Sequence, residues 1–322
     1  LIDHSSKNGS QEFNNIVSKD FFYTKGIKDF LLRVENKRTT NWLEQSFITY
    51  KQIEQKNGPF KNVIVNQASR YGLILLVSTI DNNEFVIKMI PSFLERYETE
   101  KNAYTKLSNK YMCELLGSDD ENNTLFLKRL ADGSPAKFED NKCISEFFDN
   151  VFNNMTIYTK DNTLVHFFYE ELKEKLVNKN KIPYCKKEIV NILNQAINYY
   201  ETYFSKSKKY YIHGDLRMDN ILKHGNQYYA IDPIGYVAPA VFETSRFIID
   251  DVDVNKNFNM KERLNLLVTY FSKWFEKEDI LYATYIFIAF IGYNSTFENS
   301  DNAQTKEYIE LCSIIEELLG GK

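Results

Sequence analysis

The pattern of hydrophobic and polar positions divides the chain into two regions of different character. In the first region, short apolar runs alternate with polar turns, which is typical of strands joined by tight links. We expect strands at 63–65, 71–77, 84–90, 111–116 and 124–130. Because successive strands with short links pair antiparallel, the first region is predicted to contain an antiparallel sheet.

The remaining chain shows mostly helical periodicity. Residues 11–58, ahead of the sheet, are expected to be helical and irregular. After the break at 131–135, apolar residues recur at helical spacing in the segments 144–155, 164–176, 187–204, 241–249, 260–275, 280–292 and 306–319. We therefore predict an α+β protein with an N-terminal lobe of residues 1–129, including a helical extension, and a mainly helical C-terminal lobe of residues 130–322.

One predicted strand carries a lysine among apolar residues. Side chains alternate along a strand, so Val86, Lys88 and Ile90 point to the same face. A lysine on an apolar face is costly unless an anion meets it. The ordinary alternative is an edge lysine whose long side chain reaches water.

The segment after Pro91 supplies a candidate anion. Its residues 92–95 fit the capping box S-x-x-E, so we predict that a helix starts at Ser92. The apolar stripe of this helix is Phe93, Tyr97, Tyr104 and Leu107. Steps of three and four along that stripe place Glu100 on its inner face. We predict that Glu100 pairs with Lys88, twelve residues earlier.

A third group of polar residues indicates chemistry. Asp215, Asn220 and Asp232 follow one another at spacings of five and twelve residues among short apolar runs. Residues 221–223 and 228–231 are expected to form a hairpin around the turn 224–226, which would bring Asp232 back beside Asn220.

The residue types of this group fit phosphoryl transfer. Mg²⁺ prefers oxygen ligands and usually takes only one or two from the protein. A carboxylate can orient an attacking hydroxyl and accept its proton. We therefore predict that Asp215 is the base and that Asn220 and Asp232 bind Mg²⁺, while Lys88 meets the nucleotide phosphates. The alternative is a polar loop whose carboxylates are incidental.

Composition excludes some classes of protein. The 322 residues are 43% hydrophobic and 26% charged, as in ordinary soluble globular proteins, and no apolar run is long enough to span a membrane. The net charge of −4, with lysines spread along the chain, argues against nucleic-acid binding and is compatible with a cationic small substrate. The four cysteines are scattered, and the first ten residues are polar and do not resemble a signal peptide. Both features favour a cytoplasmic protein.

Two motifs resemble the aminoglycoside phosphotransferase family, which has the protein-kinase-like fold. The element H-G-D-L-x-x-x-N runs from His213 to Asn220, and I-D-P-x-G runs from Ile231 to Gly235. The Asp-Pro form of the second motif, together with residues 125–130 before a glycine-containing turn, is most similar to the branch of streptomycin 6-phosphotransferases and hydroxyurea phosphotransferases. The resemblance spans roughly residues 63–249 and implies a bilobal fold.

The resemblance also implies an activity. Such an enzyme is a kinase with an alcohol group as acceptor: it moves the γ-phosphoryl group of ATP or GTP, with Mg²⁺, to a hydroxyl of a small molecule. The N-terminal lobe would bind the nucleotide, and the C-terminal lobe would hold the catalytic loop and the acceptor. An aminoglycoside acceptor would make the protein an antibiotic-resistance enzyme. Whether the protein is a monomer or a dimer stays open.

The roles carry over position by position. Asp215 would be the catalytic base, and Asn220 and Asp232 would bind Mg²⁺. Arg217 would stabilise charge on the transferring phosphoryl group, unless it is an ordinary surface arginine. Nucleotide contacts are implied for the side chain of Lys88, braced by Glu100, and for the backbone of Lys128, Arg129 and Leu130. His213 is expected to fix the loop by a hydrogen bond.

The sequence also departs from the family pattern. It has no G-x-G-x-x-G loop, no Asp-Phe-Gly and no Walker A motif, and residues 238–240 replace the Gly-Asp-Pro of the branch, with Glu243 at the later acidic position. Three alternatives therefore stay open: a metabolic kinase for an amino alcohol, sugar or homoserine-like acceptor, a catalytically dead nucleotide-binding module, and a Ser/Thr protein kinase. The acidic stretches 250–253 and 298–301 either line a cationic-substrate cleft or are solvated loop charge.

Overall fold

The protein divides into two compact units. The computed structural model describes residues 18–107, 111–130, 133–138, 141–160, 166–178, 187–255, 259–298 and 303–320. Unit 1 consists of Leu1–Ser108 and Cys113–Ala131, and unit 2 of Asn109–Met112 and Asp132–Lys322. The sequence predicted a single boundary after residue 129. In the structure, the short segment Asn109–Met112 belongs to unit 2, although it lies between two segments of unit 1.

Unit 1 is built around a five-stranded sheet in the order β1-β2-β3-β5-β4. The strands are β1 (Phe60–Val65), β2 (Leu73–Thr79), β3 (Glu84–Met89), β4 (Leu115–Asp119) and β5 (Thr124–Lys128). All neighbouring strands pair antiparallel. The predicted antiparallel sheet is therefore confirmed.

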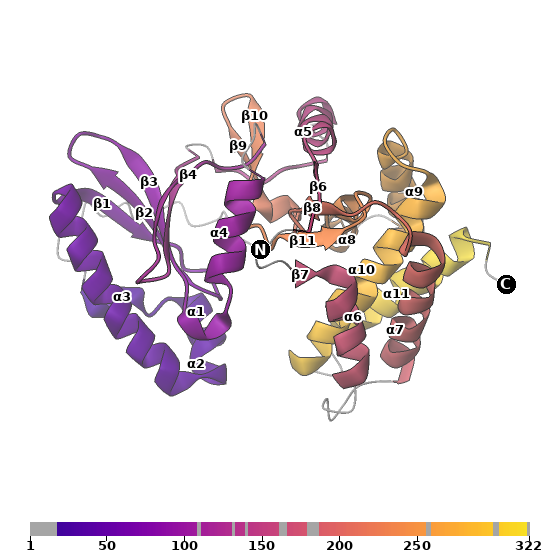
Figure 1. Cartoon of the computed structure of the whole chain (residues 1–322), viewed down its shortest axis with the longest axis horizontal. Coiled ribbons are helices and arrows are strands. Elements are labelled where there is room, and N and C mark those ends of the chain that lie inside the picture. The colour runs from indigo at the N-terminus through magenta and orange to yellow at the C-terminus, as the bar shows by residue number, and fades with distance from the viewer. Residues whose placement is uncertain are drawn as a thin grey trace. The chain divides into compact units, whose positions relative to one another are not determined.

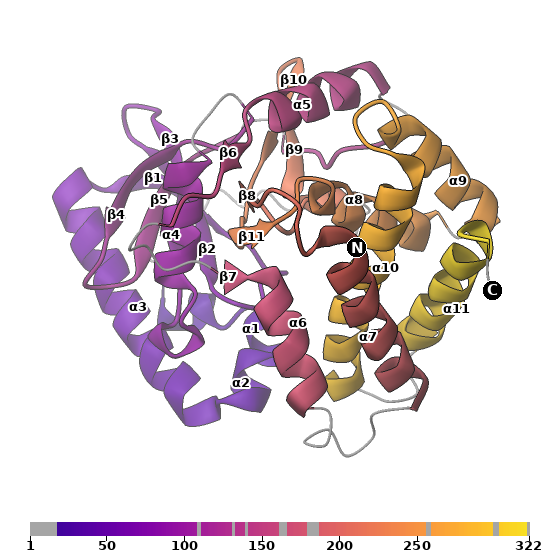
Figure 2. The same ribbon diagram turned by 45° about the vertical axis from the view of Figure 1, so that its right-hand side comes forward.

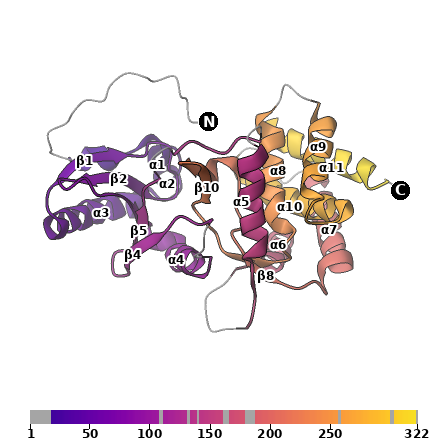
Figure 3. The same ribbon diagram turned by 90° about the horizontal axis from the view of Figure 1, so that it is seen from above.

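Helices precede and cover this sheet. They are η1 (Lys19–Phe22), α1 (Lys25–Asp29), α2 (Leu31–Val34) and α3 (Asn36–Asn57). Figures 1 and 3 show the long α3 running beside β1 and β2. Tyr50 of α3 is buried and contacts both Phe22 and Phe60 at ring-centroid distances of 5.7 and 5.9 Å. Burying each such aromatic ring stabilises the unit by roughly 1.5–3 kcal/mol.

The start of the next helix differs from the prediction. Residues Ser92–Leu94 form a short 3-10 turn, η2, and α4 spans Tyr97–Lys106. Glu95 has a φ of 53°, which takes the backbone out of the right-handed helix, and no side chain caps η2. The predicted capping box is therefore wrong, because a helix that begins at Ser92 cannot continue through a left-handed residue.

Unit 2 is mainly helical. Its helices are α5 (Asn141–Asn153), α6 (Phe168–Val177), α7 (Lys187–Tyr199), α8 (Phe242–Val254), α9 (Met260–Phe271), α10 (Lys277–Glu298) and α11 (Ala303–Leu318). Figure 2 shows α10 among the others, and it contacts α6, α7, α8, α9 and α11. The predicted helical character of the second half of the chain is confirmed.

One group of short strands in unit 2 was not predicted. A four-stranded sheet has the order β6-β8-β11-β7, with β6 (Thr156–Ile157), β7 (His166–Phe167), β8 (Tyr210–Ile212) and β11 (Tyr236–Ala238). Strand β8 lies between the helix expected over 187–204 and the candidate site. Strands of two or three residues are too short to show an alternating pattern.

The described part of the chain carries no membrane-crossing helix, since none is both long and apolar enough. Cys113 and Cys312 are buried free thiols. Cys185 lies outside the described residues.

Candidate active site

A hairpin in unit 2 brings two parts of the candidate site together. Strand β9 (Ile221–His224) pairs antiparallel with β10 (Gln227–Ala230), and the N–H of Ile231 donates to the carbonyl of Asn220 at 2.9 Å. Asp232 follows directly and is half-buried, with a φ of 62°. The predicted hairpin is confirmed, and it places Asp232 one residue beyond the partner of Asn220.

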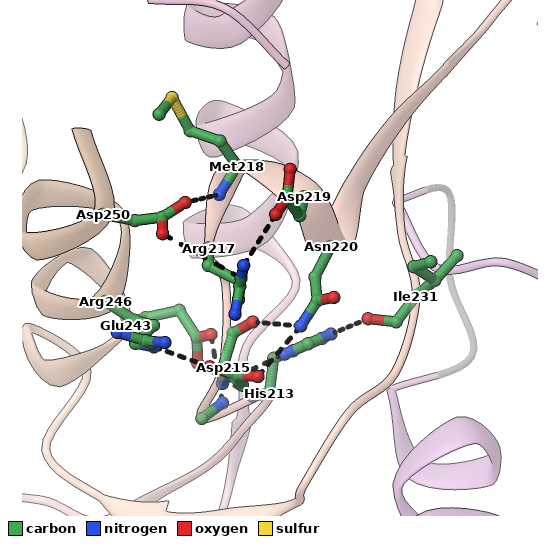
Figure 4. Close-up of polar contacts among 11 residues, drawn as sticks. His213, Asp215, Arg217, Met218, Asp219, Asn220, Ile231, Glu243, Arg246 and Asp250 are labelled. Atoms are coloured by element: carbon green, nitrogen blue, oxygen red, sulfur yellow. Dashed lines mark hydrogen bonds and ion pairs between the residues drawn. The ribbon is translucent and has the colours of Figure 1, made fainter. Parts of the chain in front are cut away.

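Both carboxylate oxygens of Asp215 are held by side chains (Figure 4). Arg246 donates from Nε to Oδ1 at 2.7 Å, and Asn220 donates from Nδ2 to Oδ2 at 2.9 Å. The amide of Asn220 also donates to the carbonyl of Asp215 at 2.9 Å. The side chain of Asp215 is 24% exposed. The carboxylate is thus fixed in direction and still accessible.

His213 and Glu243 fix the backbone of the same loop. The buried Glu243 carboxyl accepts the N–H of His213 at 2.8 Å and that of Gly214 at 3.3 Å. The imidazole of His213 lies 2.9 Å from the carbonyl of Ile231 through Nε2, and its Nδ1 accepts the N–H of Asp215 at 3.2 Å. The proton therefore resides on Nε2. His213 fixes the loop, as expected.

Gly214 has to be a glycine. Its φ is 80°, and a Cβ atom at this position would lie 2.4 Å from the ring of Tyr236 on β11. Any larger residue would have to displace that ring or the loop. The glycine lets the loop turn tightly just before Asp215.

One face of α8 holds the loop at three points. Glu243, Arg246 and Asp250 are spaced by three and four residues, so they lie on the same side of the helix. Glu243 binds the loop backbone, Arg246 binds the Asp215 side chain, and Asp250 accepts the N–H of Met218 at 2.9 Å (Figure 4). We call these three residues the α8 clasp.

The sequence interpretation of this region needs correction. Asp250 and Asp251 lie on α8 and are 8% and 0% exposed, so they are not solvated loop charge. Asp250 belongs to the α8 clasp, and Asp251 makes an ion pair with Arg263 of α9. The second acidic stretch, 298–301, falls on residues whose side chains lie outside the described part. Arg246 was not predicted, although its helical spacing from Glu243 and Asp250 was a usable signal.

Arg217 is turned toward acidic neighbours. Its Nη2 lies 2.6 Å from Asp219, and its Nε lies 3.9 Å from Asp250. The side chain is 35% exposed, so part of the guanidinium is accessible. Its action on a phosphoryl group stays a prediction.

Lys88 and Glu100 form the predicted ion pair in unit 1. The Nζ of Lys88 on β3 lies 2.5 Å from Oε1 of Glu100 on α4. The two residues are 7% and 2% exposed. A buried pair of this kind fixes the lysine side chain, and removing one partner leaves an uncompensated charge. The contact of Lys88 with phosphates stays a prediction.

The segment that is predicted to contact the nucleotide base lies at the end of β5 and just after it. The N–H of Lys128 donates to the carbonyl of Glu114 at 2.9 Å, and its carbonyl accepts from the Cys113 thiol at 3.1 Å. The side chain of Arg129 binds Glu84 at 2.8 Å. Because the N–H of Lys128 already donates within the sheet, the backbone of Arg129 and Leu130 would have to make any contact with the nucleotide base.

Comparisons with known proteins identify the architecture. No protein-family model and no curated protein matches the sequence. Choline kinase LicA from Streptococcus pneumoniae is 12% identical over 85% of this chain and 99% of its own, with a TM-score of 0.62. An aminoglycoside phosphotransferase in a ternary complex with ADP and hygromycin B is 10% identical over 84% and 99%, with a TM-score of 0.60. An ethanolamine kinase from Plasmodium vivax is 13% identical over 90% and 91%, with a TM-score of 0.60.

The chain has the fold of these kinases. Identities of 10–13% show the fold alone. The predicted class is confirmed: a kinase-like α+β fold with an antiparallel N-terminal sheet and a helical C-terminal region.

The side-chain oxygen atoms of Asn220 and Asp232 are of the type that could hold Mg²⁺. Asn220 uses its Nδ2 toward Asp215, and its amide oxygen points away from that carboxylate (Figure 4). Across the described ranges, no group of three or more His, Cys, Asp or Glu side chains could hold a metal. Two oxygen ligands from Asn220 and Asp232 fit a cation that completes its shell with phosphates and water.

The burial of Glu243 should make the free energy of unfolding depend on pH. Burial raises the pKa of Glu243 from 4.5 to about 8, although the N–H groups of Gly214 and His213 act in the opposite direction. Between these values the folded protein keeps a proton that the unfolded chain releases. The free energy of unfolding should therefore fall as pH rises through this window, by up to about 1.4 kcal/mol per pH unit, and level off above it.

Denaturant unfolding of the native protein and of Glu243→Gln across this window checks the prediction. The glutamine keeps a carbonyl acceptor but cannot titrate, so the slope should flatten. Burial also raises the pKa of Asp250, so part of the slope is expected to remain in the variant. An unchanged slope in Glu243→Gln would show that Glu243 titrates normally in the folded state.

Proposed function

We propose that the protein is a phosphotransferase that moves the γ-phosphoryl group of ATP to a hydroxyl of a small molecule. The observation that carries the proposal is the geometry around Asp215. Its carboxylate is partly accessible and fixed by Asn220 and Arg246. The hairpin brings Asp232 close to the backbone of Asn220. Support also comes from similar solved structures, which are small-molecule kinases.

Each residue has a role in this proposal. Asp215 orients the acceptor hydroxyl and takes its proton. Asn220 and Asp232 hold Mg²⁺, which neutralises charge on the phosphates. Lys88, braced by Glu100, meets the nucleotide phosphates. Arg217 offsets charge on the transferring group, and the backbone of Arg129 and Leu130 meets the base.

Adenine nucleotides are the better candidates. Two aminoglycoside phosphotransferase structures similar to this chain contain ADP or AMP-PNP, and each also contains hygromycin B. The sequence left ATP and GTP open. We propose ATP as the donor, and GTP serves as the competitor in the assay.

Two acceptor classes fit the proposal. The motifs from His213 to Gly235 and the similarity to an aminoglycoside phosphotransferase favour an aminoglycoside, and the streptomycin and hydroxyurea branch stays a sequence-based prediction. The similarity to choline and ethanolamine kinases favours an amino alcohol. Both classes place the hydroxyl on a molecule that carries positive charge, which is compatible with the net charge of −4.

An acceptor panel tests the proposal. Purified protein is incubated with ATP or GTP, Mg²⁺ and one acceptor at a time: streptomycin, hygromycin B, kanamycin, choline, ethanolamine, homoserine and simple sugars. ADP release and the mass of the acceptor are measured. We expect ADP release to depend on one acceptor class, whose mass rises by one phosphoryl group. Nucleotide binding without turnover on any acceptor would support the dead binding module instead.

Removal of the metal should stop the reaction. With the acceptor found in the panel, excess EDTA is expected to lower turnover to the uncatalysed background, because the phosphate charges lose their counter-charge. Addition of Mg²⁺ should restore it, whereas Ca²⁺, with longer and less regular coordination, should restore much less. Full activity in EDTA would contradict the roles of Asn220 and Asp232.

A further inference from the structure

Arg246 contacts Asp215 but has no assigned role among the residues of the proposed reaction. It lies on α8, 31 residues after Asp215, and donates from Nε to Oδ1 of that carboxylate at 2.7 Å. The second oxygen, Oδ2, accepts from Asn220. A carboxylate held at one oxygen can rotate about its terminal bond, whereas one held at both oxygens keeps a single orientation.

The Arg246–Asp215 pair differs from a purely structural pair that joins α8 to α9. Arg263 meets Asp251 through two parallel hydrogen bonds, and both side chains are sealed, at 7% and 1% exposure. The pair of Arg246 and Asp215 has one hydrogen bond, with side chains 16% and 24% exposed. Its geometry leaves Asp215 open to a further partner.

The other members of the α8 clasp reinforce this geometry. Glu243 holds the two backbone N–H groups just before Asp215, and Asp250 holds that of Met218 just after it. The backbone of the loop and the carboxylate of Asp215 are therefore both held by the same helix, α8. Elements of this kind hold a reacting group more accurately than a loop alone does.

We propose that Arg246 is the positioning residue that, with Asn220, aims the Asp215 carboxylate at the acceptor hydroxyl. The inference rests on the proposed function. In the reaction, the acceptor oxygen bonds to the γ-phosphorus while the bond between that phosphorus and the β–γ bridging oxygen breaks. The bond electrons leave with ADP, and the hydroxyl proton passes to Asp215. Arg246 touches none of the transferred atoms and acts only through the direction of Asp215.

The test replaces Arg246 by glutamine. Because misplacement of a reacting group by about 1 Å costs on the order of 10²-fold, we expect Arg246→Gln to lower kcat by about 10²-fold. The KM for ATP should stay within about twofold, since the nucleotide contacts are unaltered. Arg246→Lys keeps the charge but loses the planar guanidinium group. Its kcat should therefore lie between those of the native protein and Arg246→Gln.

Two matched controls and a rescue separate positioning from folding. Arg263→Gln removes a buried arginine that pairs with Asp251 of α8, and Arg33→Gln removes an exposed one, 74% exposed. Among molecules that remain folded, both should keep the native kcat. In Arg246→Ala, added ethylguanidinium should raise kcat again by filling the vacated position.

A further readout does not depend on turnover. In ¹H–¹⁵N spectra the Nε–H signal of Arg246 should move when Asp215 is replaced by asparagine. An unmoved signal, or native kcat in Arg246→Gln alongside an active native enzyme, would overturn the inference. An equal loss in folded Arg263→Gln would also overturn it, because the effect would then be structural. Absence of turnover by the native protein on every acceptor would instead overturn the proposed function, and this inference with it.

Discussion

Asp215→Asn is expected to lower kcat with the true acceptor by about 10²–10⁴-fold, the range that a general base contributes. The asparagine keeps an oxygen that can accept from Arg246 Nε, so the loop should stay in place. Affinity for ATP should change less than about threefold, because Asp215 is not proposed to touch the nucleotide. Steady-state kinetics and calorimetric titration with a non-hydrolysable ATP analogue measure the two quantities.

A surface carboxylate provides the matched control. Asp149 of α5 pairs with Lys273 on the surface and has no part in the candidate site. Asp149→Asn should leave kcat at the native value. Native turnover by Asp215→Asn would show that the hydroxyl proton has another acceptor, and loss of ATP affinity in that variant would place Asp215 among the nucleotide contacts instead.

Lys88→Met should reduce both stability and activity. The substitution removes the Lys88 charge from the buried Glu100 carboxylate, and breaking a buried ion pair costs roughly 3–5 kcal/mol of unfolding free energy. It also removes the proposed phosphate contact, so kcat/KM for ATP should fall by about 10²–10³-fold, as when one preorganised donor is deleted. Chemical denaturation and initial rates at varied ATP give the two values.

The double variant Lys88→Met/Glu100→Leu separates these effects. Replacing a buried ion pair by apolar residues of similar size is often neutral or stabilising. Stability should therefore return close to the native value, while activity stays as low as in Lys88→Met. If activity returned together with stability, the pair would be structural, and the proposed role of Lys88 toward phosphates would be wrong.

Local patterns were sufficient for those parts of the fold that depend on near neighbours. Strand alternation at Lys88 and helical stepping to Glu100 predicted an ion pair that the structure contains. The turn at 224–226 predicted the β9–β10 hairpin. In each case one element follows the next along the chain, so periodicity fixes both the face and the partner.

The same patterns could not show contacts between distant segments. The helical character near Arg246 was predicted, but its partner lies 31 residues away, and periodicity gives a direction without a partner. A charged residue on a helix face is costly to bury without a partner, so the spacing of Arg246 from Glu243 and Asp250 was a signal that sequence reasoning missed. The prediction of the start of α4 was wrong for a local reason: the capping pattern does not take account of the left-handed backbone at Glu95.

The most direct test of the central claim follows the phosphoryl group itself. Native protein is incubated with Mg²⁺, ATP labelled at the γ-phosphorus, and the acceptor that supports ADP release in the panel, in parallel with Asp215→Asn. We predict that the label appears on a hydroxyl of the acceptor in amounts equal to the ADP formed, and that the variant transfers it at least about 10²-fold more slowly. Label found only in inorganic phosphate, or transferred equally fast by the variant, would contradict the account.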